Sequence, residues 1–270
     1  MIGYYINLDR SKERRLQIED ALQRSEIAFP IQRFSAIDGK EYPIQNAHLS
    51  FGQWGCWLSH LSIIEHHANN STTEPVLILE DDSCFDKDLN SALSLINNYK
   101  EDWDIIYLDG TFVEVNDMFS INNMLNGSAT LTPEIYNIHY STTIYGTHGY
   151  ILNNKNINKI HRLIKNNMSI GLPIDNILCA LINEKKINAK IILPLIIYPS
   201  DENKKSDICN EQHPLINDWI TYRYLISLKN IKENGVENAI QKSKEIGLRR
   251  ISFDFSKKFS PLRNLQLTLE

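Results

Sequence analysis

Hydrophobic residues in this chain gather in short runs that end at polar residues, and the clearest run is Val76–Leu79. Pro75 precedes these apolar residues, and three acids follow them: Glu80, Asp81 and Asp82. A continuous apolar run of this length is typical of a strand that is buried on both faces. We therefore expect a buried strand whose carboxyl end carries three carboxylates.

Similar runs alternate with longer periodic stretches along most of the chain. Further strands are expected at 4–8, 31–37, 103–108, the end of 140–152, and 191–198. Helices are expected at about 11–24, 52–68, 89–99, 153–164 and 175–182. Strands that alternate with helices predict an α/β fold, a Rossmann-like sheet with helices on both faces. Pro194 interrupts the last strand and predicts an edge position for it.

Two stretches depart from this alternation. The pattern is lost from 111 to 139, which predicts a long excursion or a lid over a ligand crevice. From 201 the chain is polar, then helical to 247, and a tail from 248 mixes basic and aromatic residues. We expect one domain at 1–200 and an extension at 201–270. The tail could bind anionic lipid on the cytoplasmic membrane face, and a solvated terminus is the open alternative.

Composition narrows the class of protein. With 270 residues, 42% of them hydrophobic and 23% charged, the chain has the make-up of a globular protein with a sizeable core. No apolar run approaches the roughly 20 residues that cross a bilayer. The first residues lack the pattern of a secretory signal. A cytoplasmic location is the resulting expectation.

Charge and cysteine content exclude further classes. A formal net charge of −5 argues against nucleic-acid binding, which needs a basic surface. The cysteines are dispersed without a C-x-x-C pair, so neither a disulfide framework nor structural zinc is expected. Cys56 and His60 could share a helix face, but a zinc ion would need two further ligands from elsewhere.

The three acids after the buried strand are the strongest candidates for chemistry. In an open α/β sheet the carboxyl ends of the strands face the ligand crevice. Adjacent carboxylates repel one another, and a divalent cation offsets that cost. In an extended segment Glu80 and Asp82 point one way and Asp81 the other. A solvated acidic turn stays the open alternative.

Other polar residues stand where strands end. Asp109 closes a second buried strand, and Arg10, Arg14 and Arg15 cluster between the first strand and its helix. Such a basic cluster suits a phosphate or nucleotide, and a solvated basic face is the alternative. Asp38, before a glycine, could bind a ribose hydroxyl or could form a turn.

Helix starts supply the remaining candidates. Gly52 and Gly55 could let a ligand approach the backbone closely, and His60 on its own is more typical of a structural histidine. Asp175 stands at the N-cap or in the first turn of its helix, where an acid also stabilises the helix end.

Five pieces of the sequence are individually unusual and occur in order. They are Ile6–Ser11 with Arg14 and Arg15, Ala36–Gly39, Gly55–His60, Leu77–Asp82 and Ser206–Ile208. In this order they resemble glycosyltransferase family 25, which includes bacterial lipooligosaccharide galactosyltransferases and collagen-modifying relatives. The resemblance spans about residues 2 to 208.

This resemblance implies a GT-A type fold that binds a nucleotide sugar, with UDP-galactose favoured, and inversion at the anomeric carbon. It also implies a bound Mn²⁺ or Mg²⁺ held by Asp82 and Glu80, with His213 or Asp207 as a further ligand. Asp175 would be the catalytic base.

The resemblance and the residue pattern together assign two sets of binding residues. The expected donor contacts are Asn7, Leu8, Arg10, Arg14, Arg15, Ala36, Asp38, Gly39, Ser59, His60, Glu80, Asp81 and Asp109. The residues expected to face the donor sugar or the acceptor are Gly146, Thr147, His148, Gly149 and Tyr150.

The expected function is transfer of galactose, or another hexose, to an oligosaccharide acceptor on a lipooligosaccharide or lipopolysaccharide glycolipid. Two other classes stay open. Acids at strand ends also suit a two-carboxylate glycoside hydrolase. A non-catalytic saccharide-binding protein could use the same fold, because fold does not dictate function.

Overall fold

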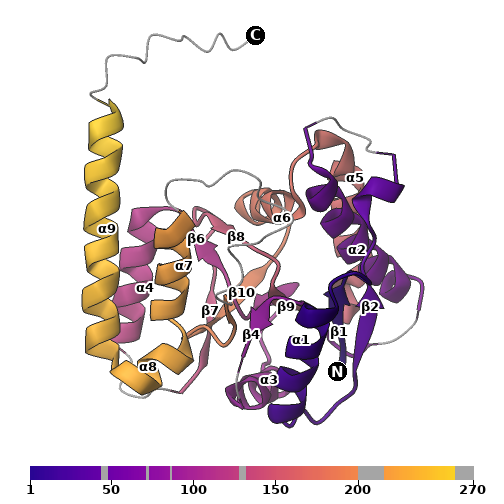
Figure 1. Ribbon diagram of the computed structural model, residues 1–270, viewed down its shortest axis with the longest axis horizontal. Helices are drawn as coiled ribbons and strands as arrows, with labels where there is room; N and C mark the ends of the chain where they lie inside the picture. Colours follow the sequence, from indigo (N-terminus) through magenta and orange to yellow (C-terminus); the bar gives the residue numbers. More distant parts are fainter. Residues whose placement is uncertain (44–47, 71–72, 86, 128–131, 200–215, 259–270) are drawn as a thin grey trace.

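The computed structural model describes residues 1–43, 48–70, 73–85, 87–127, 132–199 and 216–258, arranged around a mixed sheet (Figure 1). The seven strands of this sheet follow the order β2-β1-β3-β9-β5-β10-β7. Their bounds are β1 (Ile2–Asn7), β2 (Ile31–Ser35), β3 (Val76–Glu80), β5 (Ile105–Tyr107), β7 (Glu134–Asn137), β9 (Gly149–Leu152) and β10 (Ala189–Leu193). The pairs β1–β2, β1–β3 and β5–β10 are parallel, whereas β9 and β7 run antiparallel to their neighbours.

Helices cover both faces of the sheet. On one face, α1 (Lys12–Arg24) and α3 (Asp88–Asn98) pack on Leu77 and Leu79. On the other, α2 (Phe51–Ala68), α5 (Ile157–Asn167) and α6 (Ile174–Asn183) pack on Val76 and Ile78. All four side chains of this run are fully buried, because successive side chains of a strand point to opposite faces. The expected buried strand and the α/β class with two helical layers are confirmed.

Short elements connect these layers. Two small antiparallel pairs join β4 (Ser83–Cys84) to β11 (Tyr198–Pro199) and β6 (Thr111–Phe112) to β8 (Ile144–Tyr145). Single 3₁₀ turns are formed by η1 (Gly39–Glu41), η2 (Asn154–Asn156) and η3 (Met168–Ile170). The side chain of Asn153 accepts a hydrogen bond from the backbone of Lys155 and so caps η2 ahead of α5.

The carboxy-terminal part is helical, as expected, but the end predicted at 247 is wrong, because the last helix runs to Lys258 and Arg250 of the expected tail is buried and donates to the carbonyl of Val113. It contains α7 (Ile216–Leu225), α8 (Leu228–Asn234) and α9 (Val236–Lys258), and α9 lies alongside α4 (Val115–Gly127) (Figure 1). Tyr222 of α7 is fully buried and donates a hydrogen bond to the carbonyl of Met118 at 2.9 Å. In the described ranges, no helix combines the length and the apolar character needed to span a membrane. The domain boundary at residue 200 stays a prediction.

Two expectations for the middle of the chain are wrong. The stretch 111–139 is no featureless lid, because its described part forms β6, α4 and β7, and α4 packs against α9. The strand near Pro194 is not at the edge, because β10 lies between β5 and β7. Pro194 follows the last residue of β10, so its missing N–H does not interrupt the ladder.

Two glycines allow α2 to cross the loop before η1 at very short range. A Cβ atom on Gly55 would lie 2.5 Å from the carbonyl oxygen of Ile37, and one on Gly39 would lie 2.0 Å from that of Phe51. The backbone of Gly55 is therefore close to protein, and its lack of a side chain serves this crossing.

The Gly55→Ala substitution is expected to lower the free energy of unfolding by about 1–3 kcal/mol, because overpacking displaces backbone here. The helix preference of alanine over glycine, about 1 kcal/mol, offsets part of that cost. Thermal unfolding checks the prediction. Gly127→Ala is the control, since a Cβ there meets no atom of the described residues within 4 Å. Equal melting temperatures for the two variants would contradict the crossing as the cause.

Candidate active site

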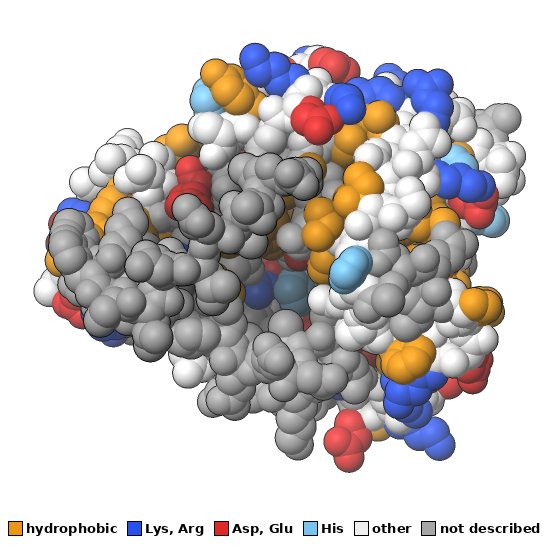
Figure 2. All heavy atoms as spheres, turned by 90° about the horizontal axis from the view of Figure 1, so that it is seen from above, with side chains coloured by type: hydrophobic (Ala, Val, Ile, Leu, Met, Phe, Trp, Pro, Cys, Tyr) orange, Lys and Arg blue, Asp and Glu red, His pale blue; other side chains and the backbone are white. Residues whose placement is uncertain are grey.

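The three acids lie where β3 ends, at the junction of two cavities. The first cavity, about 430 Å³, lies between the ends of β1 and β3, the loop before η1, and the start of α2. The second, about 300 Å³, is bounded by the 145–148 loop, the start of α6 and one side of α7. Cys56, Glu80 and Asp82 line both cavities. Figure 2 looks into a hollow of the molecule whose floor carries acidic, basic and histidine side chains.

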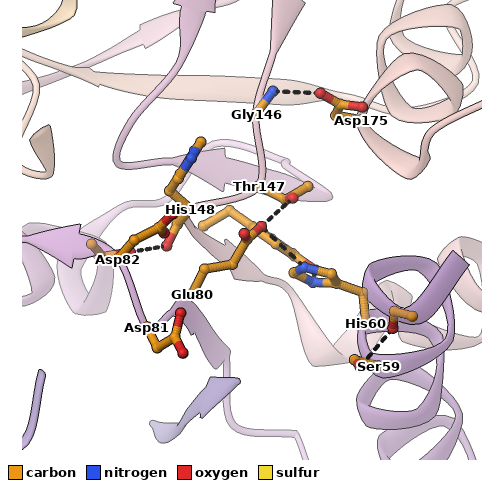
Figure 3. A network of polar contacts seen from close by, with 12 residues as sticks. Ser59, His60, Glu80, Asp81, Asp82, Gly146, Thr147, His148 and Asp175 are labelled. Carbon is orange, nitrogen blue, oxygen red and sulfur yellow. Dashed lines mark hydrogen bonds and ion pairs between the residues drawn. The ribbon is translucent and has the colours of Figure 1, made fainter. Parts of the chain in front are cut away.

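Strand pairing brings the 145–148 loop to the acids. The antiparallel register places Gly149 of β9 opposite Leu79 of β3. One residue further on, the backbone N–H of Glu80 donates to the carbonyl of His148 at 2.9 Å. The hydroxyl of Ser83 donates to the same carbonyl at 2.5 Å. The loop therefore lies directly over the carboxyl end of β3 (Figure 3).

Asp81 points away from its two acidic neighbours and holds β3 to the first strand and helix. Its carboxylate accepts a hydrogen bond from Nδ2 of Asn7 at 2.6 Å and forms an ion pair with Arg14. Burial raises the pKa of Asp81 to about 6; the Arg14 charge and the Asn7 hydrogen bond oppose this shift, while Asp82 and Glu80 add to it. These contacts give Asp81 a supporting role at the strand end.

Glu80 is held by groups on two other elements. Its Oε1 accepts a hydrogen bond from the hydroxyl of Thr147 at 2.5 Å and lies 3.3 Å from Nε2 of His60 (Figure 3). Burial alone would raise the pKa of Glu80, but the His60 hydrogen bond, the nearby His148 and the Thr147 hydroxyl outweigh it and lower the pKa below its ordinary value. Glu80 is therefore an anion inside the site.

Asp82 has an oxygen that no described residue satisfies. Arg14 lies 3.1 Å from its Oδ2, whereas its Oδ1 is buried without a hydrogen-bond partner in the described part of the chain. Ligand atoms of Glu80, Asp82 and His148 all lie within 4.8 Å of one another. A buried, unsatisfied carboxylate oxygen within such a group fits a cation, and two carboxylates with one imidazole suit Mn²⁺ or Mg²⁺.

The ring of His148 lies against an acid and a buried arginine. Its Nδ1 lies 3.4 Å from Asp109 Oδ2 and 3.3 Å from Nη2 of Arg223. Arg223, on α7, also binds both carboxylate oxygens of Asp109, and both side chains are buried. The sequence pattern did not indicate Arg223 as a site residue. Its one signal was an arginine beside apolar and aromatic residues in a helix, where a buried charge needs an acidic partner.

Asp175 lies at the second cavity, in the first turn of α6. Its Oδ2 accepts a hydrogen bond from the N–H of Gly146 at 3.1 Å, and its Oδ1 accepts one from Asn176 at 2.9 Å (Figure 3). Gly146 has a φ of +105°, a conformation that favours glycine. Burial raises the pKa of Asp175, and the two backbone hydrogen bonds only partly oppose it. Pro173, not Asp175, occupies the cap position of this helix.

The first cavity gathers many of the expected donor contacts. It is lined by Leu8, Arg10, Arg14, Ala36, Asp38, Gly39, Ser59, His60, Glu80 and Asp81. Arg10 forms an ion pair with Asp38. Ser59 accepts a hydrogen bond from the backbone of Ile37 at 2.9 Å and thereby holds the loop before η1 in place.

Some residues that were expected to contact the donor or the acceptor line neither of the two cavities. Arg15 pairs with Glu19 on α1, and Gly149 and Tyr150 are buried within β9. Asn7 donates a hydrogen bond to Asp81, and Asp109 lies 3.4 Å from Nδ1 of His148. Direct contact of Asn7 or Asp109 with the donor stays a prediction. The candidate metal ligands His213 and Asp207 fall outside the described residues.

Comparison with known proteins decides the family. The family model described as Glycosyltransferase family 25 (LPS biosynthesis protein) matches residues 1–178, about two thirds of the chain. The chain belongs to glycosyltransferase family 25. The suspected resemblance is confirmed, and family 25 membership together with the mixed sheet and its two helical layers supports the GT-A type. That the acids at the end of β3 form an active site, and not an acidic turn, stays a prediction.

Two proteins with curated names are each 25% identical to this chain. Procollagen galactosyltransferase 2 of Homo sapiens is 25% identical over 73% of this chain and 34% of its own length. A glycosyltransferase 25 family member of Anopheles gambiae is 25% identical over 76% of this chain and 38% of its own length. This chain thus spans little more than a third of the length of these relatives.

Solved structures give only distant likenesses. Glycosyltransferase GlyE of Streptococcus pneumoniae is 11% identical with a TM-score of 0.37, over 70% of this chain and 44% of its own. The galactosyltransferase LgtC, solved with donor and acceptor sugar analogs, is 10% identical with a TM-score of 0.39, over 91% and 96% of the two chains. Likenesses at these scores carry no weight for the fold or the function.

Proposed function

We propose that this family 25 chain is a metal-dependent, inverting glycosyltransferase that moves galactose, or another hexose, from a UDP-sugar to a saccharide acceptor. The observation that carries the proposal is the unsatisfied oxygen of Asp82. It lies with Glu80 and His148 where the two cavities join, so that a donor in one cavity and an acceptor in the other would meet at these residues.

The first cavity has the chemistry of a nucleotide-diphosphate site. Arg10, Arg14 and Lys40 bring positive charge to its lining, which suits a diphosphate. Asp38 stands at the end of the loop that follows β2, where an acid can bind ribose hydroxyls. A volume of about 430 Å³ lies within the range of ordinary small-molecule sites.

Glu80, Asp82 and His148 are the residues that would hold the cation, Mn²⁺ or Mg²⁺. When bound, such an ion stabilises the negative charge that develops on the departing diphosphate. Arg14 contributes beside it, because its guanidinium already contacts Asp81 and Asp82 at the same end of β3. Thr147 and His60 hold the Glu80 carboxylate in place while the donor binds.

Asp175 is the residue that would remove the proton of the acceptor hydroxyl. Its carboxylate lines the second cavity together with Glu80 and Asp82 and is fixed there by two backbone N–H groups. Burial raises the pKa of Asp175, and a carboxylate with a raised pKa is a stronger base than an exposed one. Tyr145 and Trp219 add aromatic surface for a sugar ring in this cavity.

A relative's name supports galactose as the sugar, and the family description supports a saccharide acceptor. One is named procollagen galactosyltransferase, and the family description names lipopolysaccharide biosynthesis. We extend the proposal to a lipooligosaccharide or lipopolysaccharide glycolipid as acceptor. A cytoplasmic location, with the basic tail from residue 248 against the membrane face, belongs to the same proposal.

A panel of UDP-sugars with and without Mn²⁺ tests this function. UDP-galactose at a hundred times its Kd is expected to raise the melting temperature by roughly 5–10 °C in the presence of Mn²⁺. Transfer is measured with core oligosaccharide as acceptor. Hydrolysis of a nitrophenyl galactoside without turnover of any UDP-sugar would instead indicate a glycoside hydrolase. Sugar binding without any turnover would indicate a binding protein.

A further inference from the structure

A second group of ligating side chains lies beside the proposed cation site. Cys56 and His60 are one turn apart on α2, and both face the carboxylate of Glu80. The sulfur, an imidazole nitrogen and a carboxylate oxygen of these residues lie within 4.8 Å of one another. All three residues line the first cavity, so the group is open to a small ion from that side. The sequence alone indicated only Cys56 and His60 on one helix, and the fold adds Glu80 to them.

The buried environment of His60 prepares one ring nitrogen to bind a metal. Its Nδ1 lies 2.8 Å from the hydroxyl of Tyr150, and its ring stacks on that tyrosine with centroids 5.7 Å apart. Without a metal, Nε2–H donates to the Glu80 carboxylate and the Tyr150 hydroxyl donates to Nδ1 (Figure 3). The same hydroxyl can accept a hydrogen bond from Nδ1–H in the other tautomer, which frees the lone pair of Nε2, on the side of Glu80, for a metal. Metal-binding histidines use such an outer partner to fix the ring and its tautomer.

The donor atoms of this group differ from those of the neighbouring site. Thiolate, imidazole and carboxylate, with a fourth position open to water, form a typical zinc set. The neighbouring group offers two carboxylates and an imidazole, which suit Mn²⁺ or Mg²⁺. Glu80 belongs to both groups, so one carboxylate is shared by two possible ions.

We propose that Cys56, His60 and Glu80 form a zinc-binding inhibitory site that competes with the catalytic cation for Glu80. When Zn²⁺ binds, a sulfur–zinc bond forms and the thiol proton of Cys56 passes to solvent. The zinc binding follows from these three residues alone, whereas the inhibition rests on the proposed function.

Binding is tested with Co²⁺ as a spectroscopic substitute for Zn²⁺, in a full-length chain whose other cysteines are removed. The variant Cys84→Ala/Cys179→Ala/Cys209→Ala keeps Cys56 as its single thiol. We expect a thiolate-to-cobalt absorption band at one ion per chain, which Zn²⁺ abolishes by displacing the cobalt. Adding Cys56→Ala to this background is the matched control and should remove the band. A folded single-thiol chain, verified by circular dichroism, that shows no band would overturn the site.

Inhibition is tested in Mn²⁺-supported transfer with increasing Zn²⁺. Cys56→Ala should need roughly tenfold more Zn²⁺ than the wild type for half inhibition, each relative to its own rate with Mn²⁺ alone. Cys84→Ala should behave as the wild type. Equal sensitivity of Cys56→Ala and the wild type would place the inhibition at the Asp82 group and overturn the competition. A chain that binds Co²⁺ but transfers no sugar would refute the proposed function and leave the zinc site intact.

Discussion

Replacing Asp82 with alanine is expected to abolish sugar transfer, with a loss of roughly 10³-fold or more, in a chain that stays folded. The loss is large because Asp82 carries the buried oxygen that is left unsatisfied by the described residues, and Glu80 and His148 supply only part of a ligand set. The fold should tolerate the change, because removing one of three adjacent carboxylates relieves their repulsion.

Three measurements on the Asp82→Ala protein separate these effects. Its melting temperature without metal should equal or exceed that of the wild type, and the rise caused by Mn²⁺ with UDP-galactose should disappear. Transfer should fall to the background rate. Asp102→Asn, on an exposed acid outside both cavities, is the control and should keep all three properties. Near-wild-type transfer by Asp82→Ala in the presence of a chelator would remove the cation from the mechanism.

The sequence predicted the acidic strand end because its signals are local. An apolar run buried on both faces and the acids that follow it occupy seven consecutive residues, Val76–Asp82, and the strand needs no partner to be recognised. The position of Pro194 was misjudged for the opposite reason. Whether a proline interrupts a ladder depends on where the strand ends and which strand lies beside it, and β7 comes from more than fifty residues earlier in the chain.

The composition of the site was harder to predict, because its parts come from distant segments. His148 was expected to face a sugar and does line the second cavity, but the sequence did not indicate that the pairing of β9 with β3 also brings its ring beside the acids. Asp109 was expected at the donor, and the sequence did not indicate that Arg223, 114 residues later in the chain, binds its carboxylate. Such contacts depend on sheet order and helix docking, which local pattern does not encode.

Asp175→Asn is expected to lower kcat by roughly 10²- to 10⁴-fold while leaving donor binding intact. The amide keeps the size of the carboxylate but cannot take a proton from the acceptor hydroxyl. The melting-temperature rise caused by UDP-galactose with Mn²⁺ should therefore persist. Asp117→Asn is the matched control, because burial also raises the pKa of Asp117, its carboxylate accepts a backbone N–H from Thr143 at 3.0 Å, and it lines neither cavity.

The pH dependence of kcat gives a second, independent test of the same residue. The base acts in its ionised form, so activity should be present above the pKa of Asp175 and fall about tenfold per pH unit below it. Burial raises that pKa from the ordinary aspartate value of 3.8, so the acidic limb should lie at a higher pH than an exposed aspartate would give. The residual activity of Asp175→Asn should lack this limb. An unchanged limb in the variant would assign the proton transfer to another group, because a side chain that no longer titrates cannot shape the profile.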